Sequence, residues 1–258
     1  MEGIAKYYQQ SSESNQTLQA VNSFIADQLA SEYPDYFSFE EKLGTFQIKN
    51  SLRDITLRWG TDGKLVGSTH YQSVFDALAD QVPEDIAVWQ LSDQRDYLST
   101  IHLCAPNHWA PAEKVGKPFS VIHTPVAGME KLRENYQPML AALLKPATWV
   151  RFAWGLSTDD RLNHHPEPLP GWNKEIWRGR SFDSAKPKLF VRIERQTLMG
   201  LPAVNAVLFT IRTYFMNVKD LSKEEKQALV KALNSMSAAT LRYKGLLADK
   251  GEVVQWLS

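Results

Sequence analysis

The segment FVRIERQ at residues 190–196, followed by VLFTIRTYF at residues 207–215, decides what kind of fold this chain forms. Both segments are rich in β-branched and aromatic residues, which favour strands. Successive side chains of a strand point to opposite faces of the sheet. The alternation therefore predicts Arg192 and Glu194 on one face and Arg195 on the other, and it places Arg212 on the same face as Tyr214. Because charged residues lie inside both strands, the two faces cannot both be simple core.

A third β-rich segment, TWVRFAW at residues 148–154, carries Arg151 in its middle. We expect all three segments to be central strands. Three arginines in neighbouring strands suggest a planar anion or a carboxylate held by bidentate guanidinium groups. The alternative is a structural one, in which Arg192 and Glu194 form an ion pair with Arg212 and one face of the sheet is solvated.

The remaining chain alternates irregularly between helical and β-type patterns, which favours an α+β fold over a doubly wound sheet. Apolar spacing and turn residues predict helices at 18–29, 71–81 and 129–144, strands at 45–49 and 54–59, a hairpin of 86–91 with 97–104, a long loop at 157–187, and a carboxyl-terminal helix opened by a capping box at Ser222. We expect one domain over residues 1–258, with a helical extension at 1–40, a core at 41–220 and a helix and tail at 221–258.

Composition excludes several classes of partner and site. The 29 Lys and Arg residues balance 29 Asp and Glu residues, so neither a nucleic acid nor a membrane surface is expected as a partner. Cys104 is the only cysteine, which rules out an intrachain disulfide and an iron–sulfur cluster built from this chain. The sequence shows no signal peptide and no apolar run long enough to span a membrane, so a cytoplasmic location is expected.

Residues 103–126 form a second cluster with chemical potential, because they bring Cys104, His108 and His123 among large apolar residues. A neutral imidazole in an apolar setting is a good axial ligand for haem iron, and a thiolate can also serve. The structural alternative for each histidine is a hydrogen-bonded core or surface residue. The pair His164 and His165 lies among prolines in the long loop, and there we expect solvent-facing side chains.

The strings RIERQTL at 192–198 and LFTIRTY at 208–214, together with the cluster at 103–126, resemble the haem-dependent oxidative N-demethylase family. The resemblance extends over roughly residues 40–245. It implies a PAS-like fold, in which an antiparallel sheet flanked by helices cups one haem b. It also implies a monooxygenase subunit that uses dioxygen to convert a small methylated amine into the demethylated amine and formaldehyde. Because the chain has no flavin or iron–sulfur site, a separate reductase would have to supply the electrons.

The same resemblance implies roles for individual residues. His123 is the expected iron ligand, with Cys104 as the alternative. Arg192, Arg195 and Arg212 would clamp the haem propionates, Glu194 and Tyr214 would orient the amine or relay a proton, and Trp154 would form a wall of the pocket. Two other hypotheses stay open: a haem or small-ligand sensor without turnover, and a ligand-free interaction module in which the charged strand residues are structural.

Overall fold

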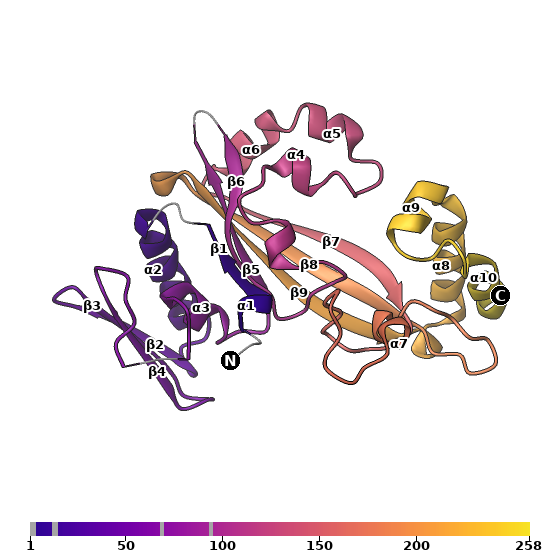
Figure 1. The fold of residues 1–258 in the computed structure, drawn as a ribbon, viewed down its shortest axis with the longest axis horizontal. Helices are drawn as coiled ribbons and strands as arrows, with labels where there is room; N and C mark the ends of the chain where they lie inside the picture. The colour runs from indigo at the N-terminus through magenta and orange to yellow at the C-terminus, as the bar shows by residue number, and fades with distance from the viewer. Residues whose placement is uncertain (1–3, 12–14, 68–69, 93–94) are drawn as a thin grey trace.

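The computed structural model describes residues 4–11, 15–67, 70–92 and 95–258, and it has two antiparallel sheets with helices packed around them (Figure 1). The large sheet has the strand order β1-β6-β5-β9-β8-β7, and the small sheet has the order β2-β3-β4. The large sheet is built from β1 (Tyr8–Gln10), β5 (Asp85–Leu91), β6 (Asp96–His102), β7 (Thr148–Ser157), β8 (Phe190–Leu201) and β9 (Ala206–Asn217). This arrangement confirms a mixed fold with an antiparallel sheet.

Strands β8 and β9 pair along their whole length and set the two faces of the large sheet. Arg192 lies opposite Phe215, Glu194 opposite Thr213, and Arg195 opposite Arg212. Directly opposed residues point to the same face, so the predicted alternation is confirmed. We call the face that carries Arg151, Arg192, Glu194 and Gln196 the polar face, and the face that carries Phe152, Arg195, Arg212 and Tyr214 the open face.

The prediction that all three segments are central strands is wrong for β7. This strand pairs with β8 on one side and forms the edge of the large sheet. Its first five residues are exposed to solvent. The aromatic composition of residues 148–154 indicates a strand but not its position, because position depends on which other strands pair with it.

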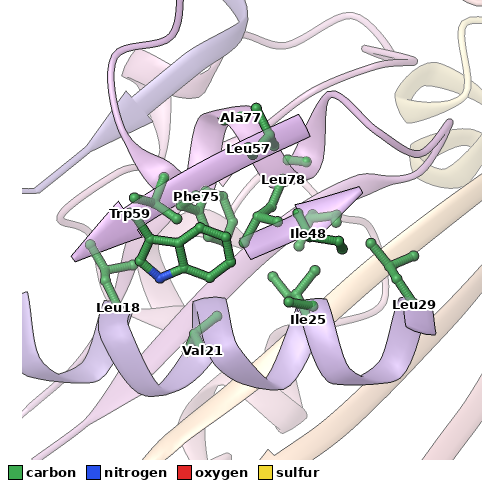
Figure 2. Packing of buried hydrophobic residues seen from close by; sticks show 14 of the residues in the cluster. Leu18, Val21, Ile25, Leu29, Ile48, Leu57, Trp59, Phe75, Ala77 and Leu78 are labelled. Carbon is green, nitrogen blue, oxygen red and sulfur yellow. The ribbon is translucent and has the colours of Figure 1, made fainter. Parts of the chain in front are cut away.

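The amino-terminal part packs helix α2 (Asn15–Glu32) and helix α3 (Val74–Ala79) against both sheets. The buried face of α2 presents Leu18, Val21, Ile25 and Leu29 to the small sheet (Figure 2). The small sheet is β2 (Phe37–Lys42), β3 (Thr45–Asn50) and β4 (Ile55–Gly60), and its fully buried Trp59 stacks on Phe46. Strand β2 was not predicted. The two strands expected after it are confirmed.

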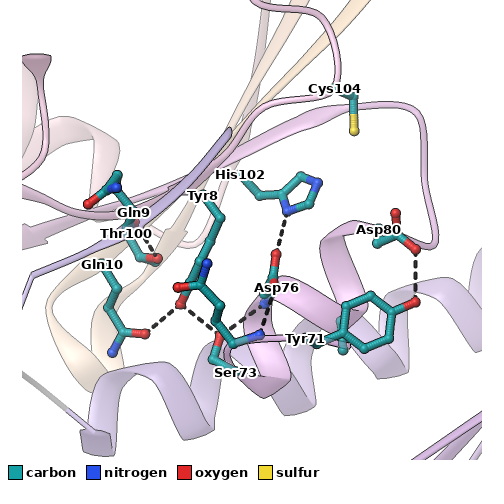
Figure 3. A network of polar contacts seen from close by, with 12 residues as sticks. Tyr8, Gln9, Gln10, Tyr71, Ser73, Asp76, Asp80, Thr100, His102 and Cys104 are labelled. Carbon is teal, nitrogen blue, oxygen red and sulfur yellow. Dashed lines mark hydrogen bonds and ion pairs between the residues drawn. The ribbon is translucent and has the colours of Figure 1, made fainter. Parts of the chain in front are cut away.

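A polar network ties the amino terminus to this region (Figure 3). The short helix α1 (Ile4–Tyr7) leads into β1, which pairs with β6. The Tyr8 hydroxyl lies 2.7 Å from Ser73 Oγ, and Ser73 caps α3 by accepting from the Asp76 amide. His102 Nδ1 lies 2.9 Å from Asp76 Oδ1. Part of the expected helical extension at 1–40 therefore belongs to the large sheet.

The hairpin of β5 and β6 is confirmed, although positions 93 and 94 of its turn lie outside the described residues. The single helix expected at 129–144 is wrong. The chain forms α5 (Glu130–Glu134) and α6 (Gln137–Leu143), preceded by α4 (Phe119–Ile122). Pro138 explains the break, because it donates no amide hydrogen and its ring clashes with the carbonyl four residues earlier.

The long loop between β7 and β8 contains one short helix, α7 (Lys174–Arg178), and is anchored by buried side chains. The expectation that His164 and His165 face solvent is wrong, since they are 1% and 5% exposed. His164 Nε2 contacts Asp159 Oδ1 at 2.9 Å, and the Trp177 indole donates to the His165 carbonyl at 2.6 Å. These contacts hold the loop together, and backbone hydrogen bonds of His164 with Pro106 and His108 attach it to the loop after β6.

The carboxyl-terminal part forms a second helical group at the other end of the large sheet (Figure 1). It consists of α8 (Lys223–Ser235), α9 (Ala238–Tyr243) and α10 (Lys250–Leu257), packed on Leu156 and Val191. The capping box at Ser222 and Glu225 is present as predicted. No helix in the described part of the chain is both long and apolar enough to cross a membrane.

Candidate functional site on the polar face

A chain of hydrogen bonds runs across the polar face and converges on Glu194. Arg151 Nε donates to Gln196 Oε1 at 2.7 Å, and Gln196 Nε2 donates to Glu194 Oε2 at 3.1 Å. The other carboxylate oxygen, Oε1, accepts from Asn107 Nδ2 at 3.0 Å and lies 3.5 Å from Arg192 Nε. Both oxygens of Glu194 are thus held in fixed positions while 15% of its side chain stays exposed.

Arg192 is the buried anchor of this network. Its side chain is 5% exposed, and its terminal nitrogen Nη2 donates to the Ala105 carbonyl at 2.7 Å and to Thr213 Oγ1 at 3.3 Å. A buried guanidinium is tolerated only when its donors and its charge are matched. The carboxylate of Glu194 supplies the opposite charge. The hydrogen bond from Arg192 to the Ala105 carbonyl connects the loop after β6 to β8.

Asp85 fixes the course of that loop. Its Oδ1 accepts from the backbone amides of Cys104 and Ala105, both at 2.7 Å. Burial raises the pKa of Asp85 to about 6, although these two amides and Arg192 act in the opposite direction. The carboxyl therefore holds the residues that lead to Asn107 and His108.

His123 follows α4, and one hydrogen-bond contact and one ring contact with Phe119 orient its imidazole. Its Nδ1 lies 2.9 Å from the Phe119 carbonyl, and its ring stacks on Phe119 at 3.9 Å between centroids. An Nδ1–H donated to a carbonyl is the usual support for a metal-binding histidine, because it leaves Nε2 as the free ligand atom. Burial first, with a smaller contribution from the charges of Lys114 and Arg151, lowers the pKa of His123 to about 4. The ring is therefore neutral at neutral pH.

The helices that connect β6 to β7 bury few side chains of their own. Helix α5 has no buried residue, and α6 buries only Leu140. Helices of five and seven residues are not stable alone and depend on packing. A flat apolar ligand beneath them would add the contacts that this segment lacks. Together with the His123 geometry, this sparse packing fits a haem.

The expected site residues do not all lie on one face. His123, Arg192 and Glu194 belong to the polar side of the large sheet, whereas Arg195, Arg212, Tyr214 and Trp154 point to the open face. One planar cofactor cannot contact both faces of a sheet. The clamp of three arginines expected for a single haem is therefore divided by the strand alternation.

Cys104 follows β6 and lies near enough to Asp85 and Asp80 for their charges to act on its thiol (Figure 3). Its Sγ is 3.5 Å from the Val82 carbonyl. Burial first, with a smaller contribution from nearby carboxylates led by Asp85, raises the pKa of the Cys104 thiol to about 12. Because the thiolate is the form that binds metals, these surroundings favour His123 over Cys104 as a ligand.

Two residues of the site, Asn107 and Gln196, were not predicted from the sequence, and Arg151 was predicted only as one of three arginines that could hold an anion. Asn107 and Gln196 bind Glu194, and Arg151 binds Gln196. Strand parity could have grouped Arg151 and Gln196 with Glu194. Nothing in the sequence pattern indicated Asn107, which reaches Glu194 from a loop 87 residues away.

Two further observations limit what else the site can hold. The described residues contain no group of three or more His, Cys, Asp or Glu side chains that could bind a metal ion. This does not count against haem, whose iron takes one or two axial ligands from the protein. A cavity of about 250 Å³ lies between α2, α3 and the turn after β4, and no residue of the polar face lines it.

Comparison with protein families agrees with the resemblance found in the sequence. The match extends over residues 3–254, so it includes both helical groups as well as the large sheet. The description of the family names haem and an alpha subunit, in agreement with the expected haem dependence and with the need for partners. The chain belongs to the family described as haem-dependent oxidative N-demethylase, alpha subunit-like.

Proposed function

We propose that this chain is the haem-binding subunit of a monooxygenase that removes a methyl group from a small secondary amine. Family membership supports the general chemistry, and the geometry of His123 is the single observation that carries the proposed site. The haem b group, when bound, would supply the dioxygen chemistry. In this proposal a separate reductase supplies the electrons.

The strand order supports a PAS-like cup on the polar face. If β1 is left out and the other strands of the large sheet are renumbered along the chain, their order is 2-1-5-4-3. Helices α4, α5 and α6 then fall between the second and third strands. A PAS-like domain would hold its ligand between this helical connection and the sheet.

His123 would hold the iron through Nε2, with its ring orientation set by Phe119. Arg151 and Lys114 are two of the cations whose charges already act on His123, so we propose them as the partners of the propionates. Arg192 is left out of this clamp, because its Nη2 already donates to the Ala105 carbonyl and to Thr213. Arg195 and Arg212 are left out of this clamp because they point to the open face.

Glu194 would bind the amine. A small secondary amine is protonated at neutral pH, and a fixed carboxylate is the natural partner of an ammonium group. Three neighbouring groups already orient Glu194, so the ammonium would be held in one position rather than several. This preorganisation would place the methyl group next to the cofactor.

The test is the absorption spectrum of the protein expressed with a haem precursor. We expect a Soret band that shifts or disappears in His123→Ala and is unchanged in His70→Ala, a matched change at an exposed histidine. A colourless wild-type protein after haem supplementation would overturn the proposal. An identical band in His123→Ala would remove His123 from the site.

A second measurement separates an enzyme from a sensor. With a chemical or enzymatic electron source, we expect dimethylamine to increase oxygen consumption and to release formaldehyde. Glu194→Gln should keep the Soret band, because it preserves the acceptor for Asn107, and should lose the response to the amine. A haem-loaded wild type with no amine-dependent consumption would favour the sensor.

A further inference from the structure

Within the described part of the chain, no helix covers the centre of the open face. Phe152, Arg195 and Arg212 form one row across β7, β8 and β9, and Trp154, Ile193 and Tyr214 form the next. Phe152 is 68% exposed and Tyr214 is 46% exposed. The amino-terminal elements cover one end of this face through Ile86, Val88 and Leu208, and α8 to α10 cover the other through Leu156 and Val191. The rows between them remain accessible.

Both charged side chains of these two rows are positive. Arg195 and Arg212 stand directly opposite each other in register, and like charges in that position destabilise a sheet. Within the described residues, neither guanidinium forms an ion pair. Glu84 is near enough for both arginines to act on its pKa, but it remains beyond ion-pair distance. Lys244, whose Nζ lies 5.3 Å from the Trp154 ring centroid, adds a third cation at the border.

We propose that the open face is the docking surface for an acidic face of the partner protein that supplies electrons to this subunit. This inference rests on the proposed function. Arginine and aromatic residues are the types most enriched at binding hot spots, and a carboxylate from a partner would relieve the repulsion between Arg195 and Arg212. Complementary charge would also speed the encounter of the two proteins.

The position of the surface suits electron delivery. Because side chains alternate along a strand, Arg195 lies directly behind the row that carries Glu194 and Gln196. A partner bound to the open face would therefore be separated from the polar face by a single layer of sheet. No other element of the described chain would stand between them in these rows.

The experiment uses the haem-loaded protein and reduced flavodoxin, a small acidic electron carrier, as the probe. For the wild type, we expect the second-order rate constant of haem reduction to decrease as salt is added. At low salt, we expect the rate constant of the double variant Arg195→Glu/Arg212→Glu to be about tenfold or more below that of the wild type. Lys223→Glu/Lys231→Glu, which changes the same charge at exposed positions of α8, is the matched control and should react like the wild type. Equal rates in both double variants would overturn the proposal.

A binding measurement keeps this test separate from the test of the proposed function. Fluorescence anisotropy of labelled flavodoxin reports docking whether or not haem is bound. Absence of a Soret band would end the proposed function, whereas binding that is equal in the wild type and in Arg195→Gln/Arg212→Gln would end the docking proposal alone. The Gln variants remove the repulsion between the arginines, so they should fold at least as well as the wild type, which circular dichroism would verify.

Discussion

Replacing Arg192 by leucine should destabilise the fold far more than replacing Arg195 by leucine. The substitution removes donors to the Ala105 carbonyl and to Thr213, and it leaves Glu194 without its buried cation. Breaking a buried ion pair by removing one partner costs about 3–5 kcal/mol. In a chain of this size, each kcal/mol lowers Tm by about 2–4 °C, so we expect a fall in Tm of about 6–20 °C.

Arg195→Leu is the matched control. Arg195 lies on the same strand, is exposed and forms no ion pair with a described residue, so its free energy of unfolding should change by about 0.5 kcal/mol or less. The measurement is urea unfolding of both variants and of the double variant Arg192→Leu/Glu194→Leu. The double variant should recover part of the loss, because it leaves no buried carboxylate unpaired.

A loss of less than about 1 kcal/mol in Arg192→Leu, the level of an exposed salt bridge, would refute a buried ion pair at this position. An equally large loss in Arg195→Leu would refute it as well. Either result would mean that the Arg192 side chain is solvated in solution, and the polar face would then lack its anchor.

Two further predictions concern the contacts that position the site. A Cβ at Gly200 would touch the carbonyl oxygens of Leu143 and Lys145, which are backbone atoms that cannot rotate away. Gly200→Ala should therefore lower the free energy of unfolding by about 1–3 kcal/mol or more, whereas Gly155→Ala, where a Cβ meets no atom within 4 Å, should be nearly neutral in the same urea titration. At His108, burial followed by the charge of Arg180 lowers the pKa well below 6.5. As the pH falls, the His108 imidazole therefore binds a proton in the unfolded chain before it does so in the folded chain. The wild type loses stability as the pH falls below about 6.5. Asparagine tolerates the φ of +63° observed at His108, so His108→Asn should lose less stability than the wild type between pH 7 and 5. The control His70→Asn should lose as much as the wild type. An equal dependence of the free energy of unfolding on pH in the wild type and in His108→Asn would contradict the role given to His108.

Local patterns were sufficient to predict most of the strands and which of their side chains share a face. The grouping of Arg192 with Glu194, and of Arg212 with Tyr214, follows from a period of two that any strand obeys. The capping box at Ser222 is equally local, because both partners lie within four residues. Such features need no knowledge of the rest of the fold.

The wrong predictions concern places where the local sequence pattern was not the deciding factor. The apolar spacing at 129–144 is helical, but Pro138 interrupts it. His164 and His165 look like surface residues in a loop rich in proline, and only contacts with residues 106 and 108, Asp159 and Trp177 bury them. The expected haem clamp joined arginines that the alternation itself assigns to two faces.

By itself, the sequence determined the strand content, the parity of the charged residues and the family to which the chain belongs. Only the tertiary structure decided that β7 is an edge, that Asn107 and Arg192 meet at Glu194, and that the row with Arg195 and Arg212 stays uncovered. The physical reason is the range of the interactions. Parity and capping act between neighbours in the chain, whereas burial and charge pairing depend on groups as far apart as residues 107 and 194, which come together only when the whole sheet has formed.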